Sequence, residues 1–75
     1  MNNYITLDPN ILVGKPIIKG TRIPVTLILN LIAHGRTVDD ILEDYPNLTK
    51  PAVIAAVKYA EDQINREEIH LTETK

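Results

Sequence analysis

Hydrophobic and polar residues follow two periods along this chain, a short one at the beginning and a helical one afterwards. From residue 25 to residue 34, VTLILNLIAH, every position is apolar except three that recur at every fourth residue: Thr26, Asn30 and His34. On a helix these three form one narrow polar stripe, and the apolar arc is much wider than the roughly 100° that a surface helix needs. Pro24 suits the first turn of such a helix and Gly35 its C-terminal end. The pattern predicts a helix that is buried on more than one side.

A second, shorter helix is predicted next. Thr37 is a good N-cap, and Asp40, three residues later, completes the pattern of a capping box. The helix, TVDDILEDY, ends before Pro46. The residues expected on its inner face are Val38, Ile41, Leu42 and Tyr45. Leu48, in the turn that follows, is expected to point inward.

The third predicted helix is the longest. Thr49 is a strong N-cap, and Pro51 is tolerated in the first turn. From there PAVIAAVKYAEDQINREEI runs without an internal breaker for about 20 residues, roughly 30 Å at 1.5 Å per residue. The apolar stripe of this helix consists of Val53, Ala56, Val57, Ala60 and Ile64. The polar end of the chain, residues 70–75, is expected to fray.

Before the helices, the chain has the pattern of short β-segments. Residues 4–7 are rich in β-formers and stop at Asp8, which predicts a short strand. The stretch GKPIIKGTRIPV, residues 14–25, places Gly20 between two apolar runs, and glycine has the backbone freedom that a tight reversal needs. A hairpin centred on Gly20 is therefore predicted. Because so small a hairpin is marginal in water, it must pack against the helices, a third strand or a second copy of the chain.

These elements predict one domain of the mainly α class. Residues 1–24 form a β-strand and hairpin arm, residues 25–70 a three-helix core, and residues 71–75 a tail. The last two helices and their short turn have the layout of a helix-turn-helix, in which the second helix can enter the major groove of DNA. Such pairs of helices are also common in proteins that never bind DNA.

Composition limits the class of protein further. The chain has 75 residues and no cysteine, and its longest apolar run is far shorter than the about 20 residues of a membrane span. It shows no secretory signal pattern, so a cytoplasmic protein without membrane contact is expected. A chain this small buries only about 60% of its unfolded surface, which favours self-association. We expect a homodimer whose interface lies on the first helix and involves Leu27, Ile28, Leu29, Leu31 and Ile32.

Charge is distributed unevenly, although the net charge is only −2. Residues 9–38 contain four cations and no acid, whereas residues 39–75 contain nine acids and four bases. This asymmetry suggests a charged partner for one half of the chain. The candidate contacts to DNA phosphates are Lys15, Lys19, Arg22, Arg36, Lys50 and Lys58. In the hairpin, such cations also have a plainer interpretation, because they prevent edge-to-edge aggregation of strands.

Direct reading of a DNA sequence by the third helix is expected to be weak. Its first two turns contain no Arg, Asn or Gln, the residues that form bidentate contacts with bases. The four acids at positions 39, 40, 43 and 44 would also repel phosphate. The basic hairpin would therefore have to supply much of the attraction to DNA.

No residue type points to catalysis. The chain has no serine or cysteine nucleophile, and no carboxylate lies in an apolar context that would tune it for acid–base chemistry. The spacing of the acids in residues 39–44 matches no metal-binding loop, so we interpret them as helix caps and a solvated face. His34 is expected to interact with the C-terminal end of its helix. We expect no enzyme activity, cofactor, metal or small-molecule substrate.

The run from residue 14 to residue 49, together with the region 53–59, resembles a widespread prokaryotic family, the domain of unknown function 433. The resemblance covers roughly residues 8–60. The residues that carry it are Gly14, Pro16, Ile18, Gly20, Thr21, Arg22, Ile23, Pro24, Val25, Gly35, Ile41, Tyr45, Pro46, Leu48 and Thr49. The chain departs from the family at residues 50–52, where members usually have an acidic or polar helix start. The resemblance implies a homeodomain-like, usually dimeric helical core, and an antitoxin-like role for members encoded beside PIN-like ribonuclease toxins.

Two functions remain open from the sequence. The first is a dimeric antitoxin that binds a toxin nuclease through its C-terminal helix and binds its own promoter weakly. An acidic surface would mask the basic RNA-binding cleft of a nuclease. The residues expected to do so are Glu61, Asp62, Glu67 and Glu68. The second is an interaction or scaffold module that makes no nucleic-acid contact.

Overall fold

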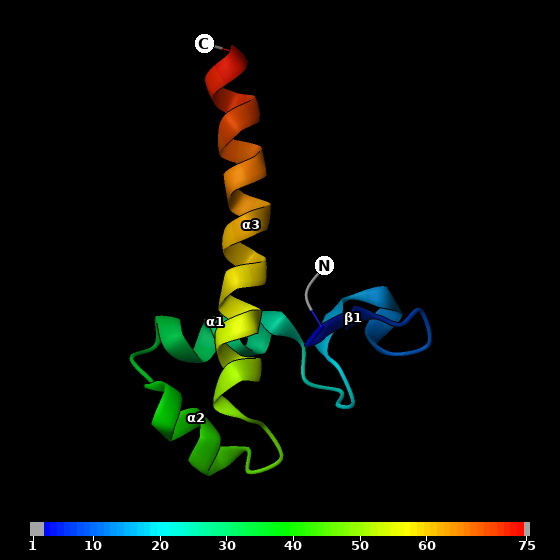
Figure 1. The fold of residues 1–75 in the computed structure, drawn as a ribbon, viewed down its shortest axis with the longest axis vertical. Helices are drawn as coiled ribbons and strands as arrows, with labels where there is room; N and C mark the ends of the chain where they lie inside the picture. The colour runs from blue at the N-terminus through cyan, green and yellow to red at the C-terminus, as the bar shows by residue number, and fades with distance from the viewer. Residues whose placement is uncertain (1–2, 75) are drawn as a thin grey trace.

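The computed structural model describes residues 3–74, and the side chains of residues 3–66. Its elements in chain order are β1 (Ile5–Leu7), the 3-10 turn η1 (Leu12–Gly14), β2 (Pro16–Ile18), α1 (Val25–Ala33), α2 (Val38–Asp44) and α3 (Lys50–Thr74). In Figure 1, α3 stands upright, α1 and α2 lie around its lower half, and the strands form an arm to one side. The predicted mainly α class, with three helices behind short strands, is confirmed.

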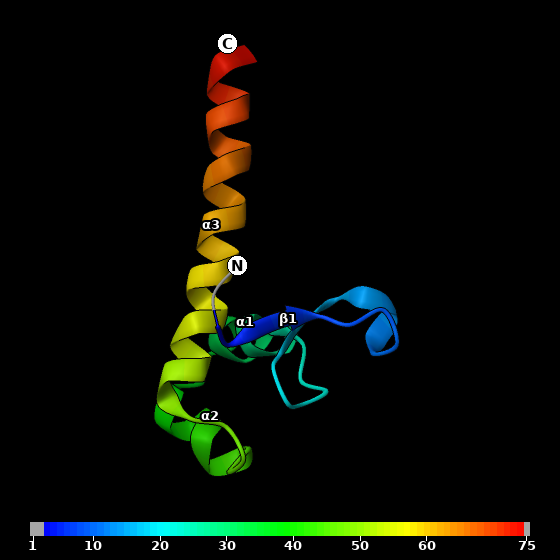
Figure 2. The same cartoon turned by 45° about the vertical axis from the view of Figure 1, so that its right-hand side comes forward.

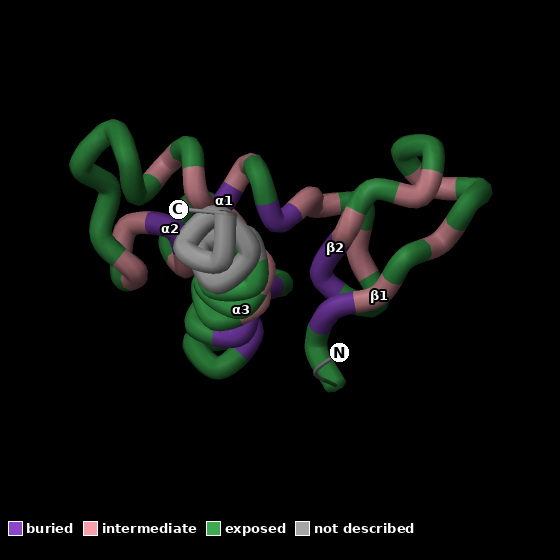
Figure 3. The backbone as a smooth tube through the Cα atoms, turned by 90° about the horizontal axis from the view of Figure 1, so that it is seen from above, coloured by how far each residue is buried: buried purple, intermediate pink, exposed green. Residues whose placement is uncertain are grey.

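The hydrophobic core lies where α1, α2 and the sheet meet the first half of α3. α1 contacts α3, α2 and β2, while α3 also contacts α2 and β1. Viewed from above, the buried segments of these elements turn toward α3 (Figure 3). The buried core side chains are Ile5, Ile18, Val25, Ile28, Ile41, Leu48, Ala52, Val53 and Ala56. Ile41 and Leu48 thus point inward as the sequence predicts.

The second half of α3 projects from this body, as two views of the ribbon show (Figures 1 and 2). α3 has 25 residues and α1 only nine. At 1.5 Å per residue, α3 is therefore more than 20 Å longer than the helix it packs against. No side chain of residues 61–66 is buried. α3 continues through residues 71–74, which the sequence assigns to a tail. That this end frays stays a prediction, and residue 75 lies outside the described residues.

The end of α1 is a Schellman motif. Gly35 has φ = +89°, a conformation that glycine adopts without strain. The Arg36 N–H donates to the Leu31 carbonyl (3.0 Å) and the Gly35 N–H donates to the Ile32 carbonyl (3.0 Å). The predicted C-terminal stop at Gly35 is confirmed. At the other end, Pro24 is the N-cap and not part of the first turn, with an extended backbone at ψ = 150°.

The start of α2 is the capping box that the sequence predicts. The Asp40 N–H donates to Thr37 Oγ1 (3.1 Å), and the Thr37 N–H donates to Asp40 Oδ2 (3.0 Å). The hydrogen bond from the Thr37 backbone, followed by the one with its side chain, holds the pKa of Asp40 below its ordinary value of 3.8. Thr49 acts similarly for α3, since its Oγ1 accepts from the Ala52 N–H (3.3 Å).

The capping box predicts a pH-dependent part of the stability. Thr37→Ala is expected to lower the free energy of unfolding by about 1 kcal/mol at pH 7. Because the pKa of Asp40 is lower in the folded than in the unfolded chain, its contribution is present above pH 3.8 and is lost as the pH falls through its folded pKa. Urea unfolding of Asp40→Asn between pH 7 and pH 3 should show a shallower loss of stability than the parent. Equal slopes would contradict this role for the carboxylate.

The sheet combines the predicted N-terminal strand with the first strand of the predicted hairpin. β1 pairs antiparallel with β2, in the register Ile5↔Ile18, Thr6↔Ile17 and Leu7↔Pro16. The chain does reverse at Gly20 (φ = +82°), and the Ile18 N–H donates to the Ile23 carbonyl (2.9 Å). Beyond the turn, however, there is only an isolated bridge between Ile17 and Pro24. Pro24 has no N–H to continue a ladder on this edge of β2, and β1 pairs with the opposite edge.

Candidate protein and nucleic-acid interfaces

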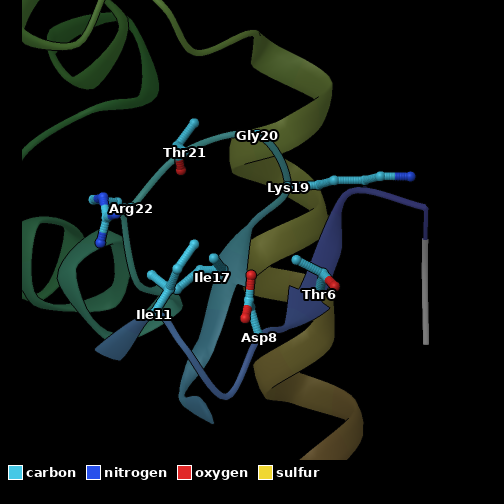
Figure 4. A pocket seen from close by; sticks show the side chains of 8 residues that line it. All are labelled: Thr6, Asp8, Ile11, Ile17, Lys19, Gly20, Thr21 and Arg22. Carbon is cyan, nitrogen blue, oxygen red and sulfur yellow. The ribbon is translucent and has the colours of Figure 1, made fainter. Parts of the chain in front are cut away.

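The arm carries a shallow hollow of about 590 Å³ beside the turn at Gly20. Lys19 and Arg22 project from opposite sides of this hollow, with Asp8 between them (Figure 4). Thr21 is occupied in holding the turn, because its Oγ1 donates to the Ile18 carbonyl (2.7 Å) and accepts from the Ile23 N–H (3.0 Å). The turn is thus a fixed support for two separated cations rather than a convergent anion site.

The predicted phosphate contacts fall into two groups. Three of them, Lys15, Lys19 and Arg22, lie on the arm, and two, Lys50 and Lys58, lie on the first turns of α3. All five side chains are exposed, and none makes an ion pair with another described residue. The arm and the start of α3 lie apart in the ribbon (Figure 1). The two groups therefore do not form one compact basic patch.

The sixth predicted phosphate contact, Arg36, already has a partner. Its guanidinium donates to the carboxylate of Asp44, and both side chains are about half exposed. This bond joins the loop after α1 to the end of α2. An exposed pair of this kind contributes little to stability. The negative charge of Asp44 does, however, reduce the attraction between the guanidinium and a phosphate. Arg36 is thus a weaker phosphate contact than the arm cations.

The exposed face at the start of α3 suits DNA reading poorly. Ile54 is 43% exposed, between Lys50 and Lys58, so an apolar side chain occupies the centre of this face. A lysine ammonium is a point charge and lacks the planar fork that recognises bases bidentately. This arrangement agrees with the weak sequence readout predicted for the third helix.

The residues predicted to form a dimer interface on α1 do not share one environment. Ile28 has an exposure of 0% within a single chain, so its assignment to the interface is wrong. β2 and α3 both contact α1 and supply the cover that was assigned to a second subunit. Leu27, Leu29 and Leu31 are half-buried, and Ile32 is 37% exposed. The interface on these four residues stays a prediction.

An apolar groove between α1 and α3 was not predicted. It encloses about 290 Å³ and is lined by Leu29, Val57, Ala60, Glu61, Ile64 and Asn65. The sequence assigns Val57 and Ile64 to the apolar stripe of the third helix, and they are 38% and 57% exposed. The helical spacing of this stripe was the available signal. What the spacing could not give is that α1 lies across the lower half of α3 and leaves the stripe beyond it uncovered (Figures 1 and 2).

The groove opens toward the acidic part of α3. Glu61 and Asp62, two of the predicted toxin contacts, are exposed, and Glu61 lies at the groove itself. The side chains of the other two, Glu67 and Glu68, lie outside the described residues. A surface with aliphatic side chains and carboxylates suits a partner that offers both apolar and basic groups.

The remaining candidate features are His34, a metal site and a membrane span. The Nδ1 of His34 lies 2.7 Å from the carbonyl oxygen of Asn30, so the ring interacts with the end of α1 as predicted. Among the described residues, no three His, Asp or Glu side chains gather closely enough to hold a metal ion. Within the same part of the chain, no helix has the length and hydropathy of a membrane span.

These features define a small helical protein with an N-terminal strand pair and a long projecting helix. The chain belongs to the family described as "Protein of unknown function (DUF433)", whose model matches residues 5–60. It is similar to a DUF433 member protein from Anabaena variabilis whose crystal structure is solved. That similarity has a TM-score of 0.76 and 35% identity, and covers 88% of this chain and 68% of the other.

A curated relative is the uncharacterized protein y4eO of Sinorhizobium fredii. It is 39% identical over 57 residues, which are 76% of this chain. The chain matches only 26% of the length of that relative. The family match ends at Ala60, so three residues of the groove, Glu61, Ile64 and Asn65, lie beyond it. The projecting half of α3 is thus outside the part of the chain that the family model describes.

Proposed function

We propose that this protein is the antitoxin of a toxin–antitoxin pair, a small dimeric protein of helix-turn-helix layout that binds and inhibits a PIN-like nuclease. The observation that carries the proposal is the projecting half of α3. This half extends beyond the body, and none of the side chains of residues 61–66 is buried. A single helix segment without tertiary packing is marginal in water. A partner that covers it would supply the missing contacts.

The chemistry of this segment supports a nuclease as the partner. Exposed carboxylates at Glu61 and Asp62 stand next to exposed Ile64. A nuclease that binds RNA needs a cationic cleft, because phosphate contacts dominate the affinity. An amphipathic helix can occupy such a cleft with its apolar residues in contact and its acids toward the cations. RNA and the antitoxin would then compete for the same cations.

The experiment that tests the proposal is capture from the native cell. The tagged full-length chain should recover a nuclease, and the recovered complex should cleave RNA more slowly than the nuclease alone. Recovery of no nuclease, or of a nuclease whose activity is unchanged in the complex, would count against an antitoxin role. In that case the scaffold module without nucleic-acid contact becomes the better account.

A second candidate function, weak binding to promoter DNA, is favoured by the arm. Lys15, Lys19 and Arg22 are exposed and without ion pairs to other described residues. If these cations contact phosphates, the observed binding constant should fall steeply with salt, with a log–log slope of about −0.9 for each phosphate neutralised. Lysine and arginine that only keep an edge strand soluble would show no such binding.

The DNA prediction is tested by an electrophoretic shift with the upstream region of the gene at about 50 and 200 mM salt. Lys19→Glu with Arg22→Glu should lower the affinity at least about 10-fold and make the slope shallower by about two. Arg66→Glu, an equal charge change per site on the projecting half of α3, is the control and should have a much smaller effect. Equal losses in both would indicate net charge alone, and no shift at low salt would favour the scaffold module.

A further inference from the structure

The loop between the two strands holds two apolar residues in an unusual backbone conformation. Leu12 has φ = 52° and Val13 has φ = 56°. Positive φ is uncommon for any residue except glycine, and for a β-branched residue it is an outlier. Four hydrogen bonds fix the loop, among them Gly14 N–H to the Ile11 carbonyl (3.2 Å) and Lys15 N–H to the Leu12 carbonyl (3.2 Å). Strain of this kind persists where the surroundings enforce it, and it clusters at binding sites.

The strained loop exposes the side chains that it carries. Val13 is 94% exposed and Leu12 is 41% exposed. Both views of the ribbon place the loop at the end of the arm that points away from α3 (Figures 1 and 2). The loop therefore cannot reach the body of its own chain. Something outside the chain must cover Leu12 and Val13 if they are to be buried.

The groove between α1 and α3 is an exposed apolar surface that a second molecule could bury. Its aliphatic residues come from both helices: Leu29, Val57, Ala60 and Ile64. Its volume of about 290 Å³ is at the lower end of the about 300–1,000 Å³ of small-molecule sites. The groove offers Glu61 and Asn65 at its polar side, and among its lining residues there is no cation. Such a groove suits a few aliphatic side chains next to a positive charge.

The arm has the complementary charge. Lys15 directly follows the loop and is exposed, and residues 9–38 contain no acid. The same chain contains both the basic apolar loop and the acidic apolar groove. The loop of one copy can therefore bind in the groove of a second copy. A twofold axis makes the contact reciprocal, so one dimer contains it twice.

We propose that the loop at Leu12 and Val13 of one protomer docks in the α1–α3 groove of its partner, with Lys15 next to Glu61 of the partner subunit. This exchange of arms gives the predicted homodimer an interface that includes Leu29 of the predicted set but is not centred on α1. It rests on neither the nuclease nor DNA, but it shares Glu61 and Ile64 with the proposed nuclease surface, so a bound nuclease would compete with the partner's loop for this groove. It also accounts for a strained valine at a fully solvated position.

The test is sedimentation of two variants, alone and mixed. Val13→Asp disables the loop and Ile64→Asp disables the groove, and both sites are exposed, so circular dichroism should stay that of the parent. Each variant alone should dimerise at least about 10-fold more weakly than the parent. A mixture should form a heterodimer more readily than either forms a homodimer, because one loop and one groove remain intact in it. Ile54→Asp, on α3 but outside the groove, is the control and should dimerise normally.

A charge exchange provides an independent measurement. Lys15→Glu and Glu61→Lys should each weaken the dimer, and the double variant should recover most of the loss, since the pair is restored with opposite sense. A parent chain that stays monomeric at about 100 μM would overturn the proposal, as would a Val13→Asp variant that dimerises like the parent. If Ile64→Asp weakens the dimer and Val13→Asp does not, the interface would consist of α3 packed against α3 of the partner. That result would also overturn the exchange of arms.

Discussion

Ile28→Ala is expected to lower the free energy of unfolding by about 3–4 kcal/mol, as large a loss as any single truncation in the core is expected to cause. Ile28 has an exposure of 0% and lies within a cluster of side chains from β1, β2 and all three helices. The deletion removes apolar contacts and leaves a cavity that fixed neighbours on several elements cannot fill. At roughly 0.05–0.15 kcal/mol per residue, a domain of this size has a total stability of about 4–11 kcal/mol, so the variant would lose a large share of it.

Urea unfolding followed by circular dichroism measures this loss. Ile54→Ala is the matched control, because the same side chain is truncated where it is 43% exposed. It should cost less than about 1 kcal/mol. A loss at Ile28 no larger than that at Ile54 would mean that the centre of the core lies elsewhere.

Glu61→Lys together with Asp62→Lys is expected to weaken the binding of the captured nuclease at least about 100-fold, an effect of about 3 kcal/mol. Both carboxylates are exposed in a single chain, so its stability should change little. Because Glu61→Lys is also expected to weaken the dimer, Glu61→Lys alone is measured beside the double variant, and the further loss on adding Asp62→Lys reports on the nuclease. In the complex, however, two new cations would face a cleft that is already cationic. Like charges brought together at an interface are strongly unfavourable, and they also slow the association.

The control for this variant reverses two acids on another helix. Asp39→Lys with Glu43→Lys changes the net charge of the chain by the same amount on α2, where both side chains are exposed. Titration calorimetry or surface plasmon resonance of the three proteins compares their affinities at one salt concentration. An equal loss in both variants would show that the nuclease senses only the total charge, and the assignment of the site to α3 would be wrong.

The local elements of this fold follow from sequence because their causes are local. Thr37 and Asp40 make reciprocal hydrogen bonds within one turn, and Gly35 adopts a conformation that glycine alone adopts freely. The start of α3 at Thr49 is of the same kind. Each of these signals lies within about four residues, and each prediction is confirmed.

The environment of α1 could not be predicted in the same way. Its wide apolar arc indicates burial on several sides, but periodicity does not say which element provides the cover. In the structure β2 and α3 cover Ile28 within one chain. The pairing of β1 with β2 is similarly non-local, since a run of apolar residues does not specify which strand it meets. For that reason the sequence predicts the turn at Gly20 but not the strand that pairs with β2.

The groove and the strained loop could not be predicted from the sequence, for two further reasons. The groove depends on where α1 crosses α3, which leaves the end of an apolar stripe exposed at Ile64. The loop depends on the backbone angles of Leu12 and Val13, residue types that carry no signal for positive φ. Both features appear only when elements remote in the chain are placed in space.

The central claim is that the projecting half of α3 is the element that binds the nuclease. Hydrogen–deuterium exchange of the captured complex, compared with the free chain, tests it directly. We expect the amides of residues 61–74 to exchange at least about 10-fold more slowly in the complex, because a bound helix opens less often, while those of α2 stay unchanged. Unchanged exchange over residues 61–74, with new protection on α2 or the arm, would contradict the account.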